Sequence, residues 1–154
     1  MSDLSAKEKE IVKFAFSIYD FEGKNEVDGV YLGDVLRAVN LNPTDKQVAE
    51  QGGTVRKKDK FFKVDEFFKM FSEIKKDKDS GSYEDFMELL LTYDKMEDGH
   101  VVLTELEYIL NNLGERLEKY EVDGVIAELC PEPDDDDMVE YEPFVMKLTK
   151  GLKK

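Results

Sequence analysis

The stretch Asp94-Lys95-Met96-Glu97-Asp98-Gly99-His100-Val101-Val102-Leu103-Thr104-Glu105 places acidic residues, a glycine and a β-branched pair within twelve residues. Apolar residues at helical spacing lie on both sides of it: Phe86, Leu89, Leu90 and Tyr93 before, and Leu103, Leu106, Leu110 and Leu113 after. Ser82-x-x-Asp85 has the pattern of an N-terminal helix cap, and Gly114 is a residue type that ends helices. Residues 82–114 are therefore predicted to form a helix, a loop and a second helix.

The same arrangement recurs along the whole chain. Four times, a β-branched or aromatic residue precedes by five positions the apolar residue that starts a helical stripe: Val27/Leu32, Phe62/Phe67, Val101/Leu106 and Val139/Phe144. The starting residues of the stripes are 35, 39 and 38 positions apart. EF-hands repeat a helix, a loop and a helix at such an interval, and loop position 8 pairs with the neighbouring loop across a short strand. We therefore expect an all-α fold of four EF-hands, with loops at residues 20–31, 55–66, 94–105 and 132–143.

Other apolar stripes predict helices in the rest of the chain. They are Ile11, Phe14, Ala15 and Ile18; Leu32, Val35, Leu36 and Val39; Phe67, Met70, Phe71 and Ile74; Val122, Val125, Ile126 and Leu129; and Tyr141, Phe144, Val145 and Leu148. Ser5-x-x-Glu8 and Thr44-x-x-Gln47 are further capping-box patterns, and the second stripe stops at Asn40. The run at residues 75–81 has no apolar residue. We therefore predict two lobes, residues 1–76 and 83–154, joined by a charged linker at residues 77–82.

The composition restricts the classes of partner. The chain has 36 acidic and 22 basic residues, a formal net charge of −14, which disfavours nucleic acid or an anionic membrane surface and favours a basic protein segment or a cation. Cys130 is the only cysteine, so no internal disulfide is expected. The N-terminus lacks the pattern of a signal peptide, and no apolar run reaches the roughly 20 residues of a membrane span. These features predict a soluble, cytoplasmic protein.

The first two loops are unsuited to calcium. A calcium loop needs oxygen ligands at positions 1, 3, 5, 9 and 12, a backbone carbonyl at 7 and a glycine at 6. In loop 20–31, Lys24 stands at position 5, Asn25 replaces the glycine and Tyr31 replaces the bidentate glutamate. In loop 55–66, Val55 and Lys57 occupy positions 1 and 3. Asp20, Glu22 and Asp28 could serve positions 1, 3 and 9 of the first loop, so only loop 55–66 is excluded as a calcium site.

The third loop comes closest to the calcium pattern. Asp94, Asp98, Gly99 and Glu105 fit positions 1, 5, 6 and 12 of the third loop, but Met96 and Val102 remove the ligands at positions 3 and 9. The candidate metal ligands Asp94, Asp98 and Glu105 therefore predict at most weak calcium or magnesium binding.

The fourth loop has Pro143 at position 12 and Asp137 in place of the glycine. Proline suits the first turn of a helix, so this loop keeps the helix start without the ligand. We interpret the acidic run at residues 134–137 as a solvated loop rather than a metal site.

Three segments resemble one family. Gly33-Asp34-Val35-Leu36-Arg37-Ala38-Val39-Asn40-Leu41-Asn42-Pro43-Thr44 resembles the run between the first two EF-hands of the myosin essential (alkali) light chains. Tyr83-Glu84-Asp85-Phe86, Tyr93-Asp94-Lys95 and Glu105-Leu106-x-x-x-Leu110-x-x-Leu113-Gly114-Glu115 resemble the third hand of that family. The resemblance covers about residues 8–149.

The resemblance implies a partner and a role. In that family the light chain wraps a heavy-chain helix at an IQ motif, a basic amphipathic sequence, and stiffens the lever arm. A regulatory light chain on the same heavy chain is then a second expected partner, and the thick filament of the myofibril an expected location. The candidate groove for the heavy-chain helix consists of Phe86, Leu90, Leu110, Leu113, Val125, Leu129 and Met146.

Two other classes of function compete with this interpretation. A calmodulin-like calcium sensor would depend on Asp94, Asp98 and Glu105. An enzyme is the weaker alternative, because His100 stands where a calcium loop uses only the backbone and Cys130 has no histidine near it in sequence. We therefore expect no catalytic residues.

Overall fold

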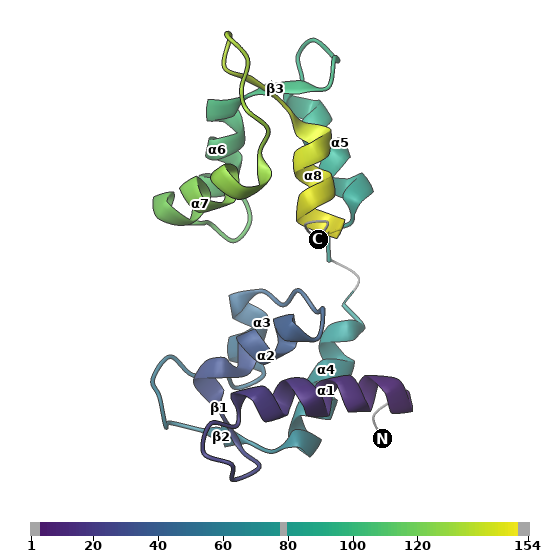
Figure 1. The fold of residues 1–154 in the computed structure, drawn as a ribbon, viewed down its shortest axis with the longest axis vertical. Helices are drawn as coiled ribbons and strands as arrows, with labels where there is room; N and C mark the ends of the chain where they lie inside the picture. Colours follow the sequence, from purple (N-terminus) through teal and green to yellow (C-terminus); the bar gives the residue numbers. More distant parts are fainter. Residues whose placement is uncertain (1–3, 78–79, 151–154) are drawn as a thin grey trace. The chain divides into compact units, whose positions relative to one another are not determined.

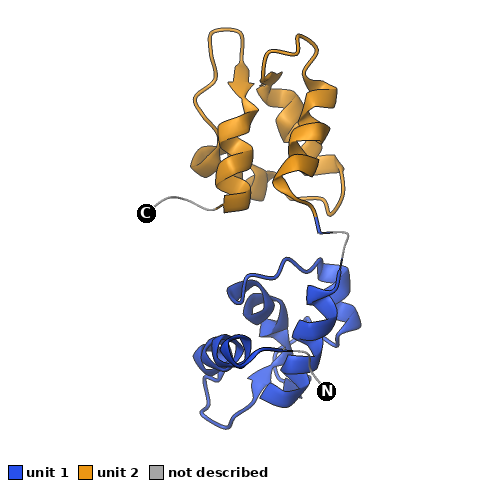
Figure 2. Ribbon diagram, turned by 90° about the vertical axis from the view of Figure 1, so that its right-hand side faces the viewer, with its two compact units in different colours: residues 1–80 blue, residues 81–154 orange. Residues whose placement is uncertain are grey.

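The computed structural model of the protein describes residues 4–77 and 80–150. The chain divides into two compact units, residues 1–80 (unit 1) and residues 81–154 (unit 2; Figure 2). The predicted linker at residues 77–82 spans this division, and its residues 78 and 79 lie outside the described part. The prediction of an all-α fold is confirmed: within the described residues, strands occur only in two short two-stranded sheets.

Each unit contains two helix–loop–helix hands (Figure 1). Unit 1 consists of α1 (Ala6–Tyr19), β1 (Val27–Asp28), the 3-10 turn η1 (Gly29–Tyr31), α2 (Leu32–Ala38), α3 (Asp45–Glu50), β2 (Phe61–Phe62) and α4 (Val64–Lys75). Unit 2 consists of α5 (Tyr83–Tyr93), β3 (His100–Val102), α6 (Leu103–Asn112), α7 (Lys119–Leu129), β4 (Met138–Glu140) and α8 (Tyr141–Lys150).

Short antiparallel strands join the two loops of each unit. Val27 pairs with Phe62 between β1 and β2, and Val101 pairs with Val139 between β3 and β4. These residues stand at position 8 of their loops, so the pairing predicted from the repeat is confirmed. The strands are buried at these positions, which fixes the register because a slip of one residue would turn them outward.

Local capping explains where several helices begin and end. The capping boxes of Ser5 with Glu8, Thr44 with Gln47 and Ser82 with Asp85 are all formed. At the end of α2, Asn40 has a φ of 65°, its N–H donates to the carbonyl of Arg37, and the N–H of Leu41 donates to the carbonyl of Leu36. This pair of hydrogen bonds is a Schellman motif, which stops the helix at the residue where the apolar stripe stops.

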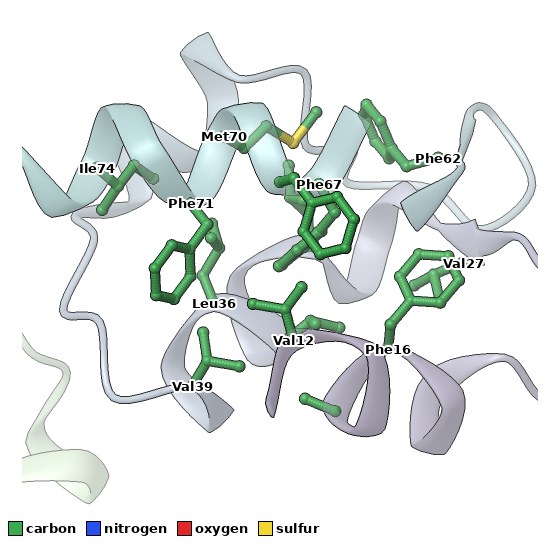
Figure 3. Close-up of a cluster of buried hydrophobic side chains, with 14 of the residues drawn as sticks. Val12, Phe16, Val27, Leu36, Val39, Phe62, Phe67, Met70, Phe71 and Ile74 are labelled. Carbon is green, nitrogen blue, oxygen red and sulfur yellow. The ribbon is translucent and has the colours of Figure 1, made fainter. Parts of the chain in front are cut away.

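The core of unit 1 consists mostly of buried residues. Fifteen buried apolar residues form it, with only five partly buried residues around them. Figure 3 shows Val12 and Phe16 of α1 facing Phe67 and Phe71 of α4, and the rings of Phe16 and Phe67 meet edge to face with centroids 6.3 Å apart. This packing joins the first and last helices of the unit.

The buried face of α1 differs from the stripe that predicted the helix. Ala15 is buried, as are Val12 and Phe16, whereas Ile11, Phe14 and Ile18 are exposed. Because apolar residues lie on both faces, the spacing indicates a helix without deciding which face enters the core.

Unit 2 is more open than unit 1. Its core contains eight buried residues, and ten partly buried apolar residues pack against them. Helix α5 lies beside α8 and α6 beside α7 (Figure 1). Much of the apolar surface of unit 2 therefore remains accessible to a partner. No helix among the described residues has the length and apolarity needed to cross a membrane.

Candidate functional site

An apolar cavity opens in unit 2 among α5, α6 and α8. Its volume is about 330 Å³. The lining residues are Phe86, Leu89, Leu90, Leu106, Ile109, Leu110, Leu113, Gly114, Glu115, Leu117, Phe144, Val145 and Leu148. Eleven of these thirteen residues are leucine, phenylalanine, isoleucine or valine, a composition that suits the apolar face of a ligand or helix. We call this cavity the unit 2 groove.

The structure brings together four of the seven predicted groove residues. Phe86 and Leu90 of α5, Leu110 of α6 and Leu113, the residue after α6, all line the groove. Val125, Leu129 and Met146 do not line it. Val125 and Leu129 are partly buried against the core of unit 2, and 36% of the Met146 surface is exposed.

The sequence reasoning missed most of the groove wall supplied by α6 and α8. Four lining residues on these helices are buried: Leu106, Ile109, Phe144 and Val145. Helical spacing alone does not show whether such a residue lies in the core or also lines a cavity. Leu148, which is 44% exposed, was part of an identified stripe at i+4 from Phe144. That spacing places both residues on one face of α8 and is the signal that could have added Leu148 to the groove.

The negative charge of the chain is concentrated in unit 2, the unit that contains the groove. Unit 1 contains 15 of the 22 basic residues and 16 of the 36 acidic residues, so it is almost neutral. Unit 2 contains the other 7 basic and 20 acidic residues and carries a formal charge of −13. An apolar groove in so acidic a unit is complementary to a segment that is both apolar and basic.

The third loop contains a buried carboxylate held by protein donors. Asp94 is only 4% exposed; its carboxylate accepts hydrogen bonds from the N–H of Gly99 at 2.8 Å, the N–H of Asp98 at 3.2 Å and the hydroxyl of Tyr141 at 3.0 Å. Burial acts to raise the pKa of Asp94, but these hydrogen bonds outweigh burial and the pKa lies below its usual value. Burial, together with the bond to Asp94, raises the pKa of Tyr141 to about 12.

The two other candidate metal ligands of the third loop also have partners within the protein. Glu105 lies 3.7 Å from the ammonium of Lys95. The Asp98 carboxylate accepts a hydrogen bond from the N–H of His100 at 3.0 Å. Within residues 4–77 and 80–150, no three histidine, cysteine or acidic side chains gather in a geometry that could hold a metal ion. Each of the three candidate ligands of this loop therefore has a partner within the protein.

The Tyr141→Phe variant tests the role of the hydroxyl. We expect the melting temperature of unit 2 at pH 7 to fall by about 3–6 °C, because the Asp94 carboxylate stays buried with one donor fewer. A depressed carboxyl pKa gives stability that is present above the unfolded pKa and is lost as the pH falls through the folded pKa. The difference between variant and wild type should therefore be full at pH 7 and shrink in acid, as measured by thermal unfolding followed by circular dichroism from pH 7 to pH 2.

Tyr120→Phe is the matched control, because Tyr120 is 74% exposed. It should leave the melting temperature unchanged at every pH. A Tyr141→Phe difference that stayed constant through the acid range would contradict the assignment to Asp94.

The first and fourth loops keep their turns without a glycine at position 6. In the first loop, the Asp20 carboxylate accepts hydrogen bonds from the N–H groups of Lys24 and Asn25, and the ammonium of Lys24 pairs with Glu22. Asn25 has a φ of 59° and Asp137 in the fourth loop a φ of 57°, so both adopt the left-handed conformation for which calcium loops use glycine. The loss of glycine at these positions is therefore compatible with the EF-hand turn.

The two side chains considered for catalysis lie in ordinary surroundings. Cys130 is partly buried, and burial raises the pKa of its thiol, which keeps it protonated. His100 forms its contacts with Asp98 in the same loop, and a hydrogen bond with the backbone of Asp98 is the main cause of its raised pKa. Neither residue is arranged as an activated nucleophile with a base.

Comparison with known proteins identifies the family. No family model matches the chain. The chain is 42% identical to proteins named myosin light chain alkali from Drosophila pseudoobscura pseudoobscura and Drosophila melanogaster, over 149 residues that cover 96% of this chain and 95% of each relative. The chain belongs to the myosin alkali light chain family. A human relative named myosin light polypeptide 6 is 31% identical over 154 residues, with 98% of this chain and 100% of the relative covered.

Two solved structures have the same fold as this alkali light chain. One is a crystal structure of Mlc1p bound to IQ2 of Myo2p, a class V myosin; it has 27% identity and a TM-score of 0.65 and covers 88% of this chain and 95% of that chain. The other is the regulatory domain of myosin II from Physarum polycephalum, with 24% identity, a TM-score of 0.72 and coverage of 95% and 97%. The resemblance seen in Gly33 to Thr44 and in the third hand is therefore confirmed at the level of the family.

Proposed function

We propose that this light chain wraps an IQ-motif helix of a myosin heavy chain and stiffens the lever arm, without catalytic activity of its own. The observation that carries the proposal is the apolar groove of about 330 Å³ in a unit of formal charge −13. The relative Mlc1p is bound to an IQ motif in its crystal structure, which supports the same kind of partner here.

The physical basis of the proposal is the fit between the groove and a basic amphipathic helix. Leu110, Leu113 and Leu148 of the groove are accessible apolar side chains, so an entering helix can bury its apolar face against them. The acidic surface of unit 2 speeds the encounter with a basic helix and contributes less to the final affinity. A long heavy-chain helix covered in this way no longer exposes its apolar residues, and it bends less readily.

The remaining parts of the proposal concern organisation and location. Residues 1–76 and 83–154 act as two lobes joined by the linker at residues 77–82. A regulatory light chain occupies a neighbouring site on the same heavy chain, and the complex resides in the cytoplasm, in the thick filament of the myofibril. The family membership supports association with myosin.

Calorimetry with an IQ-motif peptide tests the proposal. We expect the full chain to bind the peptide with a Kd below about 1 µM, and to do so equally well in calcium and in chelator, within about threefold. The control peptide keeps every basic residue and replaces the apolar anchors by serine, and it should bind far more weakly. Absence of binding to the native peptide in both conditions would refute the proposed function.

A calmodulin-like sensor is the second candidate, favoured by Asp94, Asp98 and Glu105 in one loop. We propose that divalent-ion binding to this loop is weak, with a calcium Kd no tighter than about 0.1 mM, because each of the three side chains has a partner within the protein. Calcium titration in excess magnesium distinguishes the two candidates. Micromolar binding that enlarges the groove would favour the sensor.

A further inference from the structure

The loop end of unit 1 combines the main basic run of the chain with an aromatic cavity. Figure 1 shows the loop after α1 and the loop before β2 at the end of unit 1 where β1 and β2 pair. These two loops line a cavity of about 240 Å³, separate from the unit 2 groove. Neither loop has a complete set of calcium ligands, and the groove of unit 2 assigns this end of unit 1 no role.

Aromatic rings form one wall of this cavity. Phe21 contacts Tyr31 edge to face at 5.2 Å between centroids and contacts Tyr19 at 6.2 Å. Phe21 nevertheless remains 69% exposed, although it is a large apolar residue. A side chain entering the cavity would contact a set of rings that already support one another, and Phe21 would lose its exposure to water.

Charged residues form the rest of the lining: Lys24, Lys57 and Lys58, together with Glu22, Glu26 and Asp28. The segment Arg56-Lys57-Lys58-Asp59-Lys60-Phe61-Phe62-Lys63 has five basic residues and one acidic residue, in a protein of net charge −14. Lys57 and Lys58 line the cavity, and neither forms an ion pair with a carboxylate of the described residues.

The acidic residues at the cavity are largely engaged by donors of the chain itself. The Asp28 carboxylate accepts hydrogen bonds from the N–H of Lys58 at 2.7 Å and the N–H of Val30 at 3.2 Å, and Glu22 pairs with Lys24. Glu26 is the third carboxylate in the lining. The ammonium of Lys57 lies 6.0 Å from the centre of the Tyr31 ring, beside the aromatic wall, and the charge of Lys58 helps to lower the pKa of Glu22. Neither ammonium forms an ion pair within the described residues, so both can contact an incoming anion, whereas two of the three carboxylates already have cationic or N–H partners.

We propose that this end of unit 1 docks an acidic protein segment that carries one aromatic or large aliphatic side chain. The side chain enters the cavity beside Phe21 and Tyr31, and the acidic residues flanking it contact Lys57 and Lys58. Local charge complementarity decides the class of partner, because the run at residues 56–63 has a formal charge of +4 and unit 1 as a whole is almost neutral, so an acidic segment is attracted to this run. The proposal is independent of the unit 2 groove and of its partner.

Fluorescence anisotropy of the full chain tests the proposal. The probe is a labelled ten-residue peptide of glutamate and aspartate with one central phenylalanine, titrated at low salt. We expect saturable binding with a Kd below about 1 mM, and a peptide with serine in place of the phenylalanine should bind about fivefold more weakly, because it leaves the cavity unfilled.

Two variants with matched controls locate the binding surface. Lys57→Glu with Lys58→Glu should weaken binding of the probe at least about tenfold, and Phe21→Ala about fivefold. The controls are Arg116→Glu with Lys119→Glu, which reverses two exposed charges in unit 2, and Tyr120→Ala, which removes an exposed ring there. Controls that bind the probe like the wild type support the proposal, provided that all variants keep the circular dichroism spectrum of the wild type.

Four outcomes would overturn the proposal. They are absence of saturable binding, equal losses in the controls, tighter binding of vesicles of anionic phospholipid through Lys57 and Lys58, and dimerisation that Lys57→Glu with Lys58→Glu abolishes. The third outcome would assign the surface to lipid and the fourth to a second copy of the chain. The IQ-motif peptide serves as a separate readout: its binding should be unchanged in these unit 1 variants, so failure here is distinguishable from failure of the proposed function.

Discussion

Leu113→Lys is expected to weaken binding of an IQ-motif peptide about a hundredfold. Leu113 lines the unit 2 groove, and 41% of its surface is exposed in the free chain, so lysine is tolerated there without a partner. When a helix covers the groove, the ammonium must lose water without gaining a hydrogen-bond partner, and it also faces a basic ligand. These two costs together amount to about 3 kcal/mol. Calorimetry with the native peptide measures the loss directly.

Leu91→Lys is the matched control for this prediction. Leu91 is 51% exposed on α5 and does not line the groove, although it lies next to the lining residue Leu90 in sequence. The control introduces the same charge into the same unit and should bind the peptide like the wild type. If both variants lost affinity equally, the effect would be one of overall charge, and the groove would not be the binding site.

Phe67→Ala is expected to remove about 3–5 kcal/mol from the stability of unit 1. Phe67 is fully buried on α4, and its ring contacts Phe16 of α1, so the truncation leaves a cavity where the first and last helices of the unit meet (Figure 3). A unit of about 75 residues has little stability in reserve. The variant should therefore unfold in unit 1 at much lower denaturant concentration than the wild type, as followed by circular dichroism in urea.

Phe14→Ala tests whether this loss depends on burial rather than on the aromatic ring. Phe14 lies on α1 but is 70% exposed, and its replacement should change the stability by no more than about 0.5 kcal/mol. Comparable losses in the two variants would mean that the outer face of α1 is covered in solution.

The fold was predictable because its signals are local and repeat. Val27, Phe62, Val101 and Val139 stand at the same loop position, and each must be apolar for the paired loops to be buried. The capping boxes of Ser5, Thr44 and Ser82 can likewise be predicted from the sequence, since a capping box needs only two residues three positions apart. The orientation of α1 was not predictable, because Ile11 and Phe14 compete with Val12 and Phe16 for the core and only tertiary packing decides between them.

The groove was predictable only in part. Its wall on α5 contains residues of a clear stripe, such as Phe86 and Leu90. By contrast, Val125 and Leu129 have the same helical spacing but pack against the core of unit 2, and spacing alone does not distinguish a core from the wall of a cavity. The hydrogen bond from Tyr141 to Asp94 joins residues 47 positions apart, so no local sequence pattern predicts it.

That hydrogen bond couples the third hand to the fourth. The hydroxyl that satisfies the carboxylate of one hand belongs to the first residue of the last helix of the other. Consider a chimera that takes a cation-binding third hand from a relative but keeps Tyr141. In it, the Tyr141 hydroxyl would compete with the ion for the carboxylate at the first position of the loop. Restoring ion binding by grafting therefore requires a change at Tyr141 as well as in the third loop.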